Sequence, residues 1–142
     1  MAPASDAQRL LGGWRLVSAL TNGQVNAARG PNPTGLIFYD PSGWMSVNIQ
    51  GDHPPINIAG ETPTAEEAHA ALSTYWAYFG TYTVDEQART VTHHRTGSAN
   101  PGWHRHRDFV RAYEFLGPDR VVLRPQAPAR NGNELVWERL RS

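Results

Sequence analysis

The stretch GTYTVDEQARTVTHH, residues 80–94, ends in two adjacent histidines, His93 and His94. Its runs of Thr, Tyr and Val on either side of a polar segment are typical of a β-hairpin. An imidazole titrates near neutral pH, so a histidine in a protected site can serve as a general acid or base. Successive residues of a strand point to opposite faces, so only one of the two histidines can face a given interior.

A turn over residues 85–88 predicts which of the two faces inward. It places Gly80 opposite His93, with Tyr82 on the same face. On this register Tyr82 and His93 line the interior, and Gly80 leaves empty volume beside the imidazole. A bulge or an odd-length loop would turn His94 inward instead.

Arg111 is a further candidate, because Phe109 and Tyr113 flank it at a spacing of two and predict an otherwise aromatic strand face. A buried guanidinium keeps its charge and needs a carboxylate, carbonyl groups, an aromatic ring or a ligand anion as its partner. Backbone groups and water satisfy most such side chains on strands, which is the alternative interpretation. Together with Tyr82 and His93, Arg111 would form a polar cluster in an apolar cavity, the usual anatomy of a small-molecule site.

The stretch WHRHRDF, residues 103–109, places His104, His106 and Asp108 at a spacing of two, so all three would share one face of a strand. Two histidines and a carboxylate are a ligand set for zinc or non-haem iron. The intervening arginines add positive charge, and a solvated polar strand end accounts for the same pattern. Because short His-x-His signals are weakly specific, we expect no metal site here.

The clearest hairpin is GLIFYDPSGWMSVNIQ, residues 35–50, whose central Asp-Pro-Ser-Gly favours a turn. Pairing Tyr39 with Trp44 across it puts Phe38 opposite Met45, with Val47 on the same side. That side is wholly apolar, so Phe38, Met45 and Val47 are expected to point inward.

Two helices are expected, each opened by a capping box. The first, at residues 6–11, begins after Ser5 with Gln8 three residues on, and the second, at residues 65–77, follows Thr64 in the same way. Further strands are predicted at residues 14–20, 78–84, 89–96, 105–115, 120–125 and 134–140. About eight consecutive strands joined by short turns predict one all-β domain over residues 1–142, a closed antiparallel up-and-down barrel. Such a barrel encloses side chains alone or one small ligand.

Composition excludes several classes of function. Thirteen basic residues balance thirteen acidic ones, so no global field attracts nucleic acid or an anionic membrane. The chain has no cysteine, so it can form no disulfide, thiolate nucleophile or zinc–thiolate site. No apolar run is long enough for a signal peptide or a membrane span, so we expect a cytoplasmic protein. No phosphate-cradling or dinucleotide motif is present, so no cofactor is expected. The oligomeric state stays open, with a homodimer as one alternative.

Several stretches together resemble the lipocalin-like domain family, small stand-alone barrels of bacteria and fungi within the calycin group. They cover nearly the whole chain and are LLGGWRLVSA, PNPTGLIFYDPSGWMSV, YFGTYTVDEQARTVTHH and NPGWHRHRDFVRAYEF. The resemblance implies a closed barrel with an internal cavity. It also implies that Trp14 lies at the narrow end under the N-terminal helix, packed by Arg139 or, as second choice, Arg141.

The family pattern also matches at Gly80, Tyr82, the His93–His94 pair and Arg111, whereas the two histidines of HRHR depart from it. By the same resemblance, the inserted helix before Tyr78 fits a lid or plug beside the barrel mouth.

Three functions compete. The first is a cofactor-independent enzyme of the isomerase, cyclase or lyase type, doing acid/base chemistry on a small apolar or aromatic molecule such as a secondary metabolite. Its catalytic residues would be His93 as acid or base, Tyr82 as donor to a developing oxyanion and Arg111 as anchor of an anionic group. The second is a carrier of a small hydrophobic ligand, and the third is a structural module with a filled interior. The residues expected to contact a ligand are Phe38, Met45, Val47, Tyr78, Gly80, His94, Phe109 and Tyr113.

Overall fold

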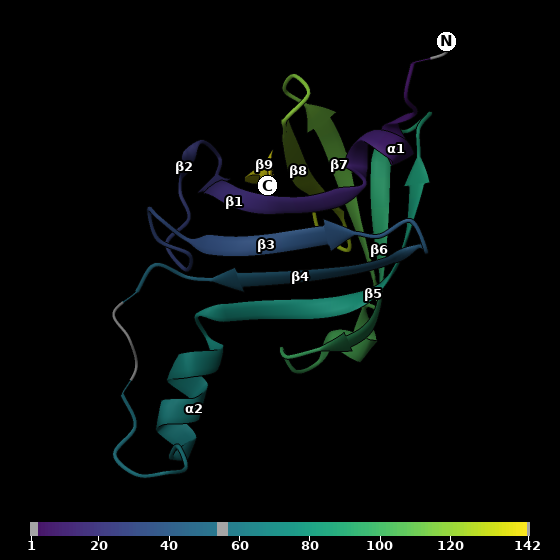
Figure 1. Cartoon of the computed structure of the whole chain (residues 1–142). Coiled ribbons are helices and arrows are strands. Elements are labelled where there is room, and N and C mark those ends of the chain that lie inside the picture. The colour runs from purple at the N-terminus through teal and green to yellow at the C-terminus, as the bar shows by residue number, and fades with distance from the viewer. Residues whose placement is uncertain (1–2, 54–56, 142) are drawn as a thin grey trace.

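The computed structural model describes residues 3–53 and 57–141. Within them the helices are α1 (Asp6–Leu10) and α2 (Ala65–Leu72), with a 3₁₀ turn, η1, at Trp103–Arg105. The strands are β1 (Gly12–Thr21), β2 (Gln24–Val25), β3 (Thr34–Tyr39), β4 (Trp44–Gln50), β5 (Tyr75–Asp85), β6 (Thr90–Ser98), β7 (Asp108–Phe115), β8 (Arg120–Ala127) and β9 (Asn133–Arg139). Figure 1 labels these elements along the ribbon.

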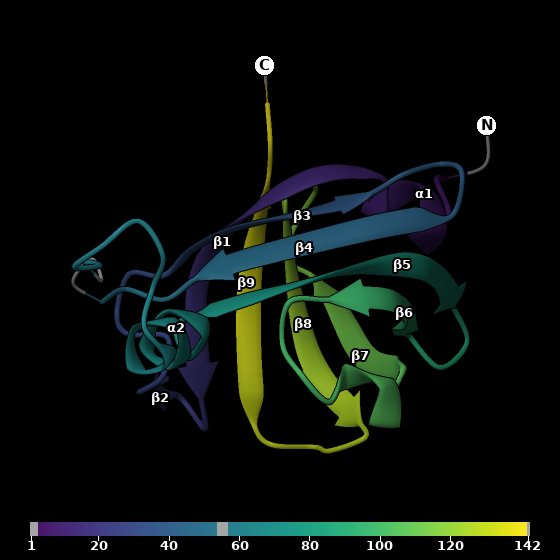
Figure 2. The ribbon, with the colours of Figure 1, turned by 90° about the horizontal axis from the view of Figure 1, so that it is seen from below.

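All strands except β2 close into an antiparallel barrel, because β1 pairs with β3 on one side and with β9 on the other. From β3 to β9 each strand pairs with the next one along the chain, and β2 only extends the end of β1. Figures 1 and 2 show β3, β4 and β5 lying side by side, with β7 and β8 on the other wall of the barrel. The predicted closed up-and-down barrel of about eight strands is therefore confirmed.

Both predicted capping boxes are present, at Ser5 for α1 and at Thr64 for α2. The second helix is shorter than predicted, because β5 begins at Tyr75 and its aromatic residues suit a pleated sheet. α2 projects from the end of β5 (Figure 1), and none of its residues is buried. None of the helices among the described residues has the length and apolar character needed to cross a membrane.

The first hairpin has a register one residue away from the predicted one. Tyr39 lies opposite Met45, so Tyr39 is buried while Phe38 points outward with 44% of its surface exposed. The cause is Gly43, whose φ of 93° adds a left-handed residue to the turn and whose N–H donates to the Asp40 carbonyl at 3.0 Å. A shift of one exchanges the faces of one strand, so the prediction that Phe38 faces the interior is wrong.

One end of the barrel is closed by α1 and the start of β1. Trp14 is fully buried there, and its indole Nε1–H donates to the Leu10 carbonyl at 2.9 Å. The Arg139 guanidinium lies 4.2 Å from the centre of the Trp14 ring and donates to the carbonyls of Leu11 and Arg9. The expected packing of Arg139 on Trp14 is confirmed.

Candidate functional site

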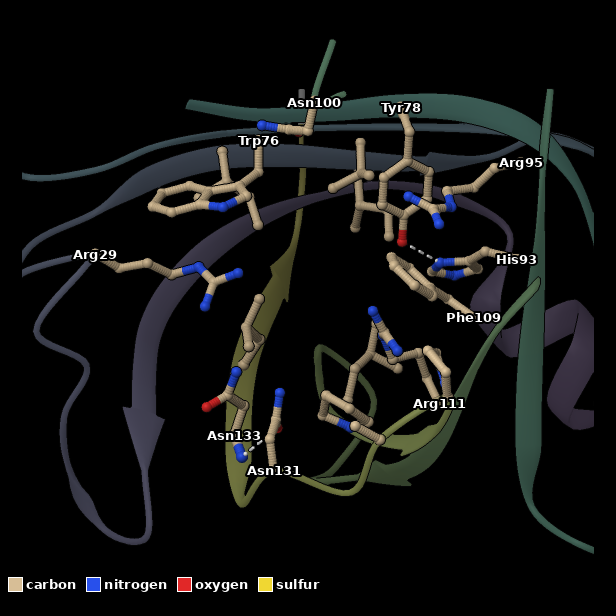
Figure 3. Close-up of a pocket in the computed structure, with 18 of the residues that line it drawn as sticks. Arg29, Trp76, Tyr78, His93, Arg95, Asn100, Phe109, Arg111, Asn131 and Asn133 are labelled. Carbon is tan, nitrogen blue, oxygen red and sulfur yellow. Dashed lines mark hydrogen bonds between the residues drawn. The ribbon is translucent and has the colours of Figure 1, made fainter. Parts of the chain in front are cut away.

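The barrel encloses a cavity of about 360 Å³. Its walls come from the inward faces of the strands and from the loops that follow β2, β6 and β8. The lining residues are Arg29, Ile37, Val47, Ile49, Trp76, Tyr78, His93, Arg95, Asn100, Phe109, Arg111, Leu123, Pro125, Pro128, Ala129, Asn131, Asn133, Leu135 and Trp137. Figure 3 shows the polar members of this set converging on a space walled by aromatic and aliphatic side chains.

His93, on β6, is held between two tyrosines. Its Nε2 lies 2.6 Å from the hydroxyl of Tyr39 on β3, and its Nδ1 lies 2.6 Å from the hydroxyl of Tyr78 on β5. The imidazole is only 1% exposed. Burial, with Arg111 as the next cause, lowers the pKa of His93 well below its ordinary value of 6.5, so the ring is neutral at neutral pH.

The Tyr39 hydroxyl fixes the direction of these hydrogen bonds. Tyr39 is 1% exposed, and His93 Nε2 is the one partner of its hydroxyl within the described residues. Because a buried O–H needs an acceptor, we infer that Tyr39 donates to Nε2 and that the ring proton of His93 is on Nδ1. Nδ1–H then donates to the Tyr78 oxygen, so the proton of Tyr78 is available to an acceptor in the cavity.

Both tyrosines are neutral in this arrangement. Burial raises the pKa of Tyr39 well above its ordinary value. Burial also raises the pKa of Tyr78, against the opposing charge of Arg111 nearby. Tyr39, His93 and Tyr78 therefore form a chain of neutral hydrogen-bonding groups that ends at the cavity, and each bond polarises the next.

Three arginines line the same cavity. Arg95 is 8% exposed, lies 3.7 Å over the Phe109 ring and donates to the carbonyls of Trp103 and His106. The Arg111 guanidinium also lies over the Phe109 ring, 4.5 Å from its centre. Arg29, in the loop after β2, lies across the cavity (Figure 3) and stacks 4.6 Å over Trp76.

Several predicted ligand contacts do lie at the cavity. Val47, Tyr78, His93, Phe109 and Arg111 all line it. The pairing of β5 with β6 differs from the predicted one by two residues. A shift of two leaves the faces unchanged, so the inward orientation of His93 is confirmed.

Tyr82, Tyr113 and Met45 face inward but lie away from the cavity, in the packed part of the barrel. The Tyr82 hydroxyl donates to the Asp40 carbonyl at 2.9 Å, and the Tyr113 hydroxyl donates to Asp6 of α1 at 2.6 Å. Met45 is buried in the core. Contrary to the prediction, these three and Phe38 do not line the cavity, because spacing along a strand gives the face but not the depth in the barrel.

The predicted roles of Gly80 and His94 in the cavity are also wrong. A Cβ on Gly80 would lie 1.9 Å from the His94 carbonyl oxygen, so Gly80 permits a close backbone approach at a β-bulge and leaves no empty volume. His94 lies outside the barrel, where its ring contacts Thr83 and Asp108, each at 2.9 Å.

The stretch WHRHRDF is not a strand along its whole length. His104 lies in η1, His106 follows it, and β7 begins only at Asp108. The shared strand face that the metal alternative required is therefore absent. Across residues 3–53 and 57–141, no three His, Asp or Glu side chains are grouped closely enough to hold a metal ion.

Four residues that line the cavity or hold His93 were not predicted from the sequence. Arg95 follows Val91 and His93 at a spacing of two, so strand alternation could have found it. The inward position of Tyr39 could be predicted only with the correct turn, because the predicted register put Tyr39 on the outer face. Arg29 and Trp76 lie in a loop and at a strand start, where no periodicity marks them.

A closed antiparallel barrel with an internal cavity of mixed polarity defines a class of protein whose interior suits one small ligand. This chain belongs to the lipocalin-like domain family, whose model matches residues 11–140. No curated protein is significantly similar to it in sequence.

Two designed proteins share the fold. A redesigned β-barrel is 12% identical, with a TM-score of 0.51 over 99% of this chain and 100% of that one. A de novo designed fluorescence-activating β-barrel is 11% identical, with a TM-score of 0.51 over 97% and 100%. At this identity the likeness concerns the fold alone.

Proposed function

We propose that this protein binds a small, largely apolar or aromatic organic molecule inside the barrel. The observation that carries the proposal is the cavity of about 360 Å³, which lies at the small end of the size range of ligand pockets. Trp76, Phe109 and Trp137 offer aromatic surface, and Ile37 with Val47 adds aliphatic wall. Such surface favours a planar apolar body, because burying it removes water from both partners.

Binding is tested with N-phenyl-1-naphthylamine, an uncharged probe whose fluorescence rises in apolar surroundings. We expect saturable binding of one probe per chain. Leu135→Trp fills the cavity and should weaken binding by about tenfold or more. Leu116→Trp, at an exposed position after β7, is the matched control and should bind as the parent does. Absence of saturable binding, or equal binding by the Leu135 variant, would reject the proposal.

A catalytic function is the second candidate, favoured by the donor chain that ends at Tyr78 beside Arg111. In a cofactor-independent isomerisation, cyclisation or hydration, the Tyr78 O–H would donate to an oxygen that gains negative charge, and Arg111 would stabilise that charge. Both His93 nitrogens are engaged by tyrosines, so His93 would act through Tyr78 rather than on the substrate itself.

Catalysis is tested with the enolisable aromatic ketone 2-tetralone in D₂O, following deuterium incorporation by NMR. An enzyme of this type should accelerate exchange by stabilising the enolate while solvent takes up the α-proton and returns a deuteron, and Tyr78→Phe should remove most of the acceleration. Tyr82→Phe is the control, because the Tyr82 hydroxyl is bonded to the Asp40 carbonyl away from the cavity. Exchange at the background rate in the parent protein would leave the binding function without a catalytic one for this class of ketone.

A further inference from the structure

The cavity gathers positively charged side chains and no carboxylate among its described lining residues. Arg29, Arg95 and Arg111 line it, and no aspartate or glutamate is among its lining residues in the described chain. The guanidiniums repel one another. Burial is the largest cause that lowers the pKa of Arg29 and of Arg95, and the charge of Arg111 lowers both further. Like charges facing one low-dielectric space repel strongly, which opposes folding unless something offsets it.

Six of the ten arginines outside the cavity are paired with a carboxylate, and the other four, Arg89, Arg105, Arg107 and Arg130, are exposed to solvent. Those within 4.0 Å of a carboxylate are Arg9, Arg15, Arg120, Arg124, Arg139 and Arg141. None of the three cavity arginines has such a partner among the described residues. The cavity arginines therefore differ from the arginines elsewhere in the chain.

Unused hydrogen-bond donors point the same way. Three buried side-chain nitrogens of described residues have no partner, namely Nε of Arg29, Nε of Arg95 and Nε1 of Trp137. All three residues line the cavity. A buried N–H without an acceptor is costly, so three of them around one cavity indicate that it is built to hold hydrogen-bond acceptors as well as apolar surface.

We propose that the ligand is an organic anion, a flat aromatic molecule bearing a carboxylate. Its carboxylate lies by Arg111 and the Tyr78 hydroxyl, with the charge of Arg95 behind them, while its apolar body extends toward Trp76 and Arg29. This proposal rests on the binding function proposed above and adds the chemical class of the ligand.

The chemistry fits the carboxylate at each contact. A guanidinium presents parallel N–H donors that match the two carboxylate oxygens. The Tyr78 O–H, polarised by the chain from Tyr39 through His93, supplies a neutral donor to the same group. Figure 3 shows Arg111 and Tyr78 facing each other on one side of the cavity, with Arg29 on the opposite side.

The test compares two probes that differ in one charged group, the anion 8-anilinonaphthalene-1-sulfonate and the uncharged N-phenyl-1-naphthylamine. We expect the parent protein to bind the anion at least about tenfold more tightly. Arg111→Met should remove about tenfold of the affinity for the anion and leave that for the uncharged probe nearly unchanged. Competition by 2-naphthoate, set against 2-naphthamide, isolates the carboxylate, and the acid should displace the bound anion at lower concentration.

Two further variants separate the site from general charge. Arg111→Lys keeps a positive charge and should retain part of the preference for the anion. Arg105→Met removes one exposed charge outside the cavity and should change neither affinity. Circular dichroism and the uncharged probe verify that each variant is folded.

The outcomes distinguish the two proposals. Equal binding of both probes, with Arg111→Met altering neither, overturns the anionic ligand while the binding function stands. If neither probe binds the parent protein, the binding function fails, and the anionic ligand fails with it.

Discussion

At the scale of single residues, the site depends on hydrogen bonds that burial leaves no freedom to rearrange. Tyr39 has one partner in the described chain, and this assigns the His93 tautomer and the direction of the bond to Tyr78. The inward position of His93 could be predicted from strand alternation. The partners on either side of it could not, since they come from β3 and β5 and depend on the register of both strands.

The buried neutral His93 predicts a pH dependence of folding stability. The groups that face it are Tyr39, Tyr78, Arg95 and Arg111, and its folded-state pKa lies well below the ordinary 6.5. As pH falls below about 6.5, the unfolded chain takes up a proton here that the folded chain does not. The free energy of unfolding should therefore fall with decreasing pH, by up to about 1.4 kcal/mol per unit from this group.

Urea unfolding measured from about pH 7.5 to 5 checks this dependence. His93→Gln keeps a neutral polar side chain and should flatten the slope, even if the variant is less stable throughout. His94→Gln alters the neighbouring imidazole outside the barrel and serves as the control, with the slope due to His93 retained. An unchanged slope in the His93 variant would contradict the assignment.

The uncompensated arginines predict a gain in stability when one is removed. Arg111→Met eliminates a charge that no carboxylate of the described chain offsets, so the free energy of unfolding should rise by about 1 kcal/mol while anion binding weakens by about tenfold. Arg124→Met is the comparison, because Arg124 pairs with Glu114 and Glu134 at the surface and should change stability by less than about 0.5 kcal/mol. Thermal and urea unfolding without ligand measure both. A clear loss of stability in the Arg111 variant would show that the charge is compensated within the protein.

At the scale of strands and turns, the two hairpins differ in how well they could be predicted. In the central hairpin the predicted pairing was two residues off, and the inward residues were still identified. In the first hairpin the error was one residue, caused by the left-handed Gly43, and it exchanged Phe38 with Tyr39. An error of an even number of residues in the register keeps the strand faces, and an odd one exchanges them. The inward residues can therefore be predicted from the sequence only if the turn is known to hold an odd or an even number of residues.

The bulge in β5 and β6 gives the prediction at this scale. Gly80→Ala would place a methyl group against the backbone of His94, which cannot move without breaking the pairing that aims His93 inward. We expect a loss of about 3 kcal/mol in the free energy of unfolding, toward the upper end for a single substitution. Gly60→Ala is the control, because no heavy atom lies within 4 Å of the added carbon, and it should be nearly neutral. Chemical denaturation of both variants measures the difference, and equal stabilities would mean that the bulge can relax.

At the scale of the whole molecule, the barrel has two distinct regions, a packed end and a cavity. Trp14, Leu10 and Arg139 pack one end closed, and Tyr113 is tied there to α1. The cavity lies between the remaining inward faces and the loops. The closed barrel could be predicted from the number and spacing of strands. The charge of the cavity could be predicted only in part, since alternation along the strands points to Arg95 and Arg111, whereas Arg29 comes from a loop.

This division predicts that stability and ligand affinity can be changed separately. Arg139→Met removes hydrogen bonds to the carbonyls of Leu11 and Arg9 and the contact with Trp14, so the free energy of unfolding should fall by about 2 kcal/mol. The affinity of the folded protein for 8-anilinonaphthalene-1-sulfonate should stay within about twofold. Arg29→Met should do the opposite, weakening that affinity several-fold while leaving stability unchanged or higher, because its guanidinium has no carboxylate partner in the described residues. Titration at a temperature where both variants are fully folded, together with urea unfolding, gives the two quantities. If Arg139→Met weakened binding as much as Arg29→Met, the packed end and the cavity would be coupled, and the two regions would act as one unit.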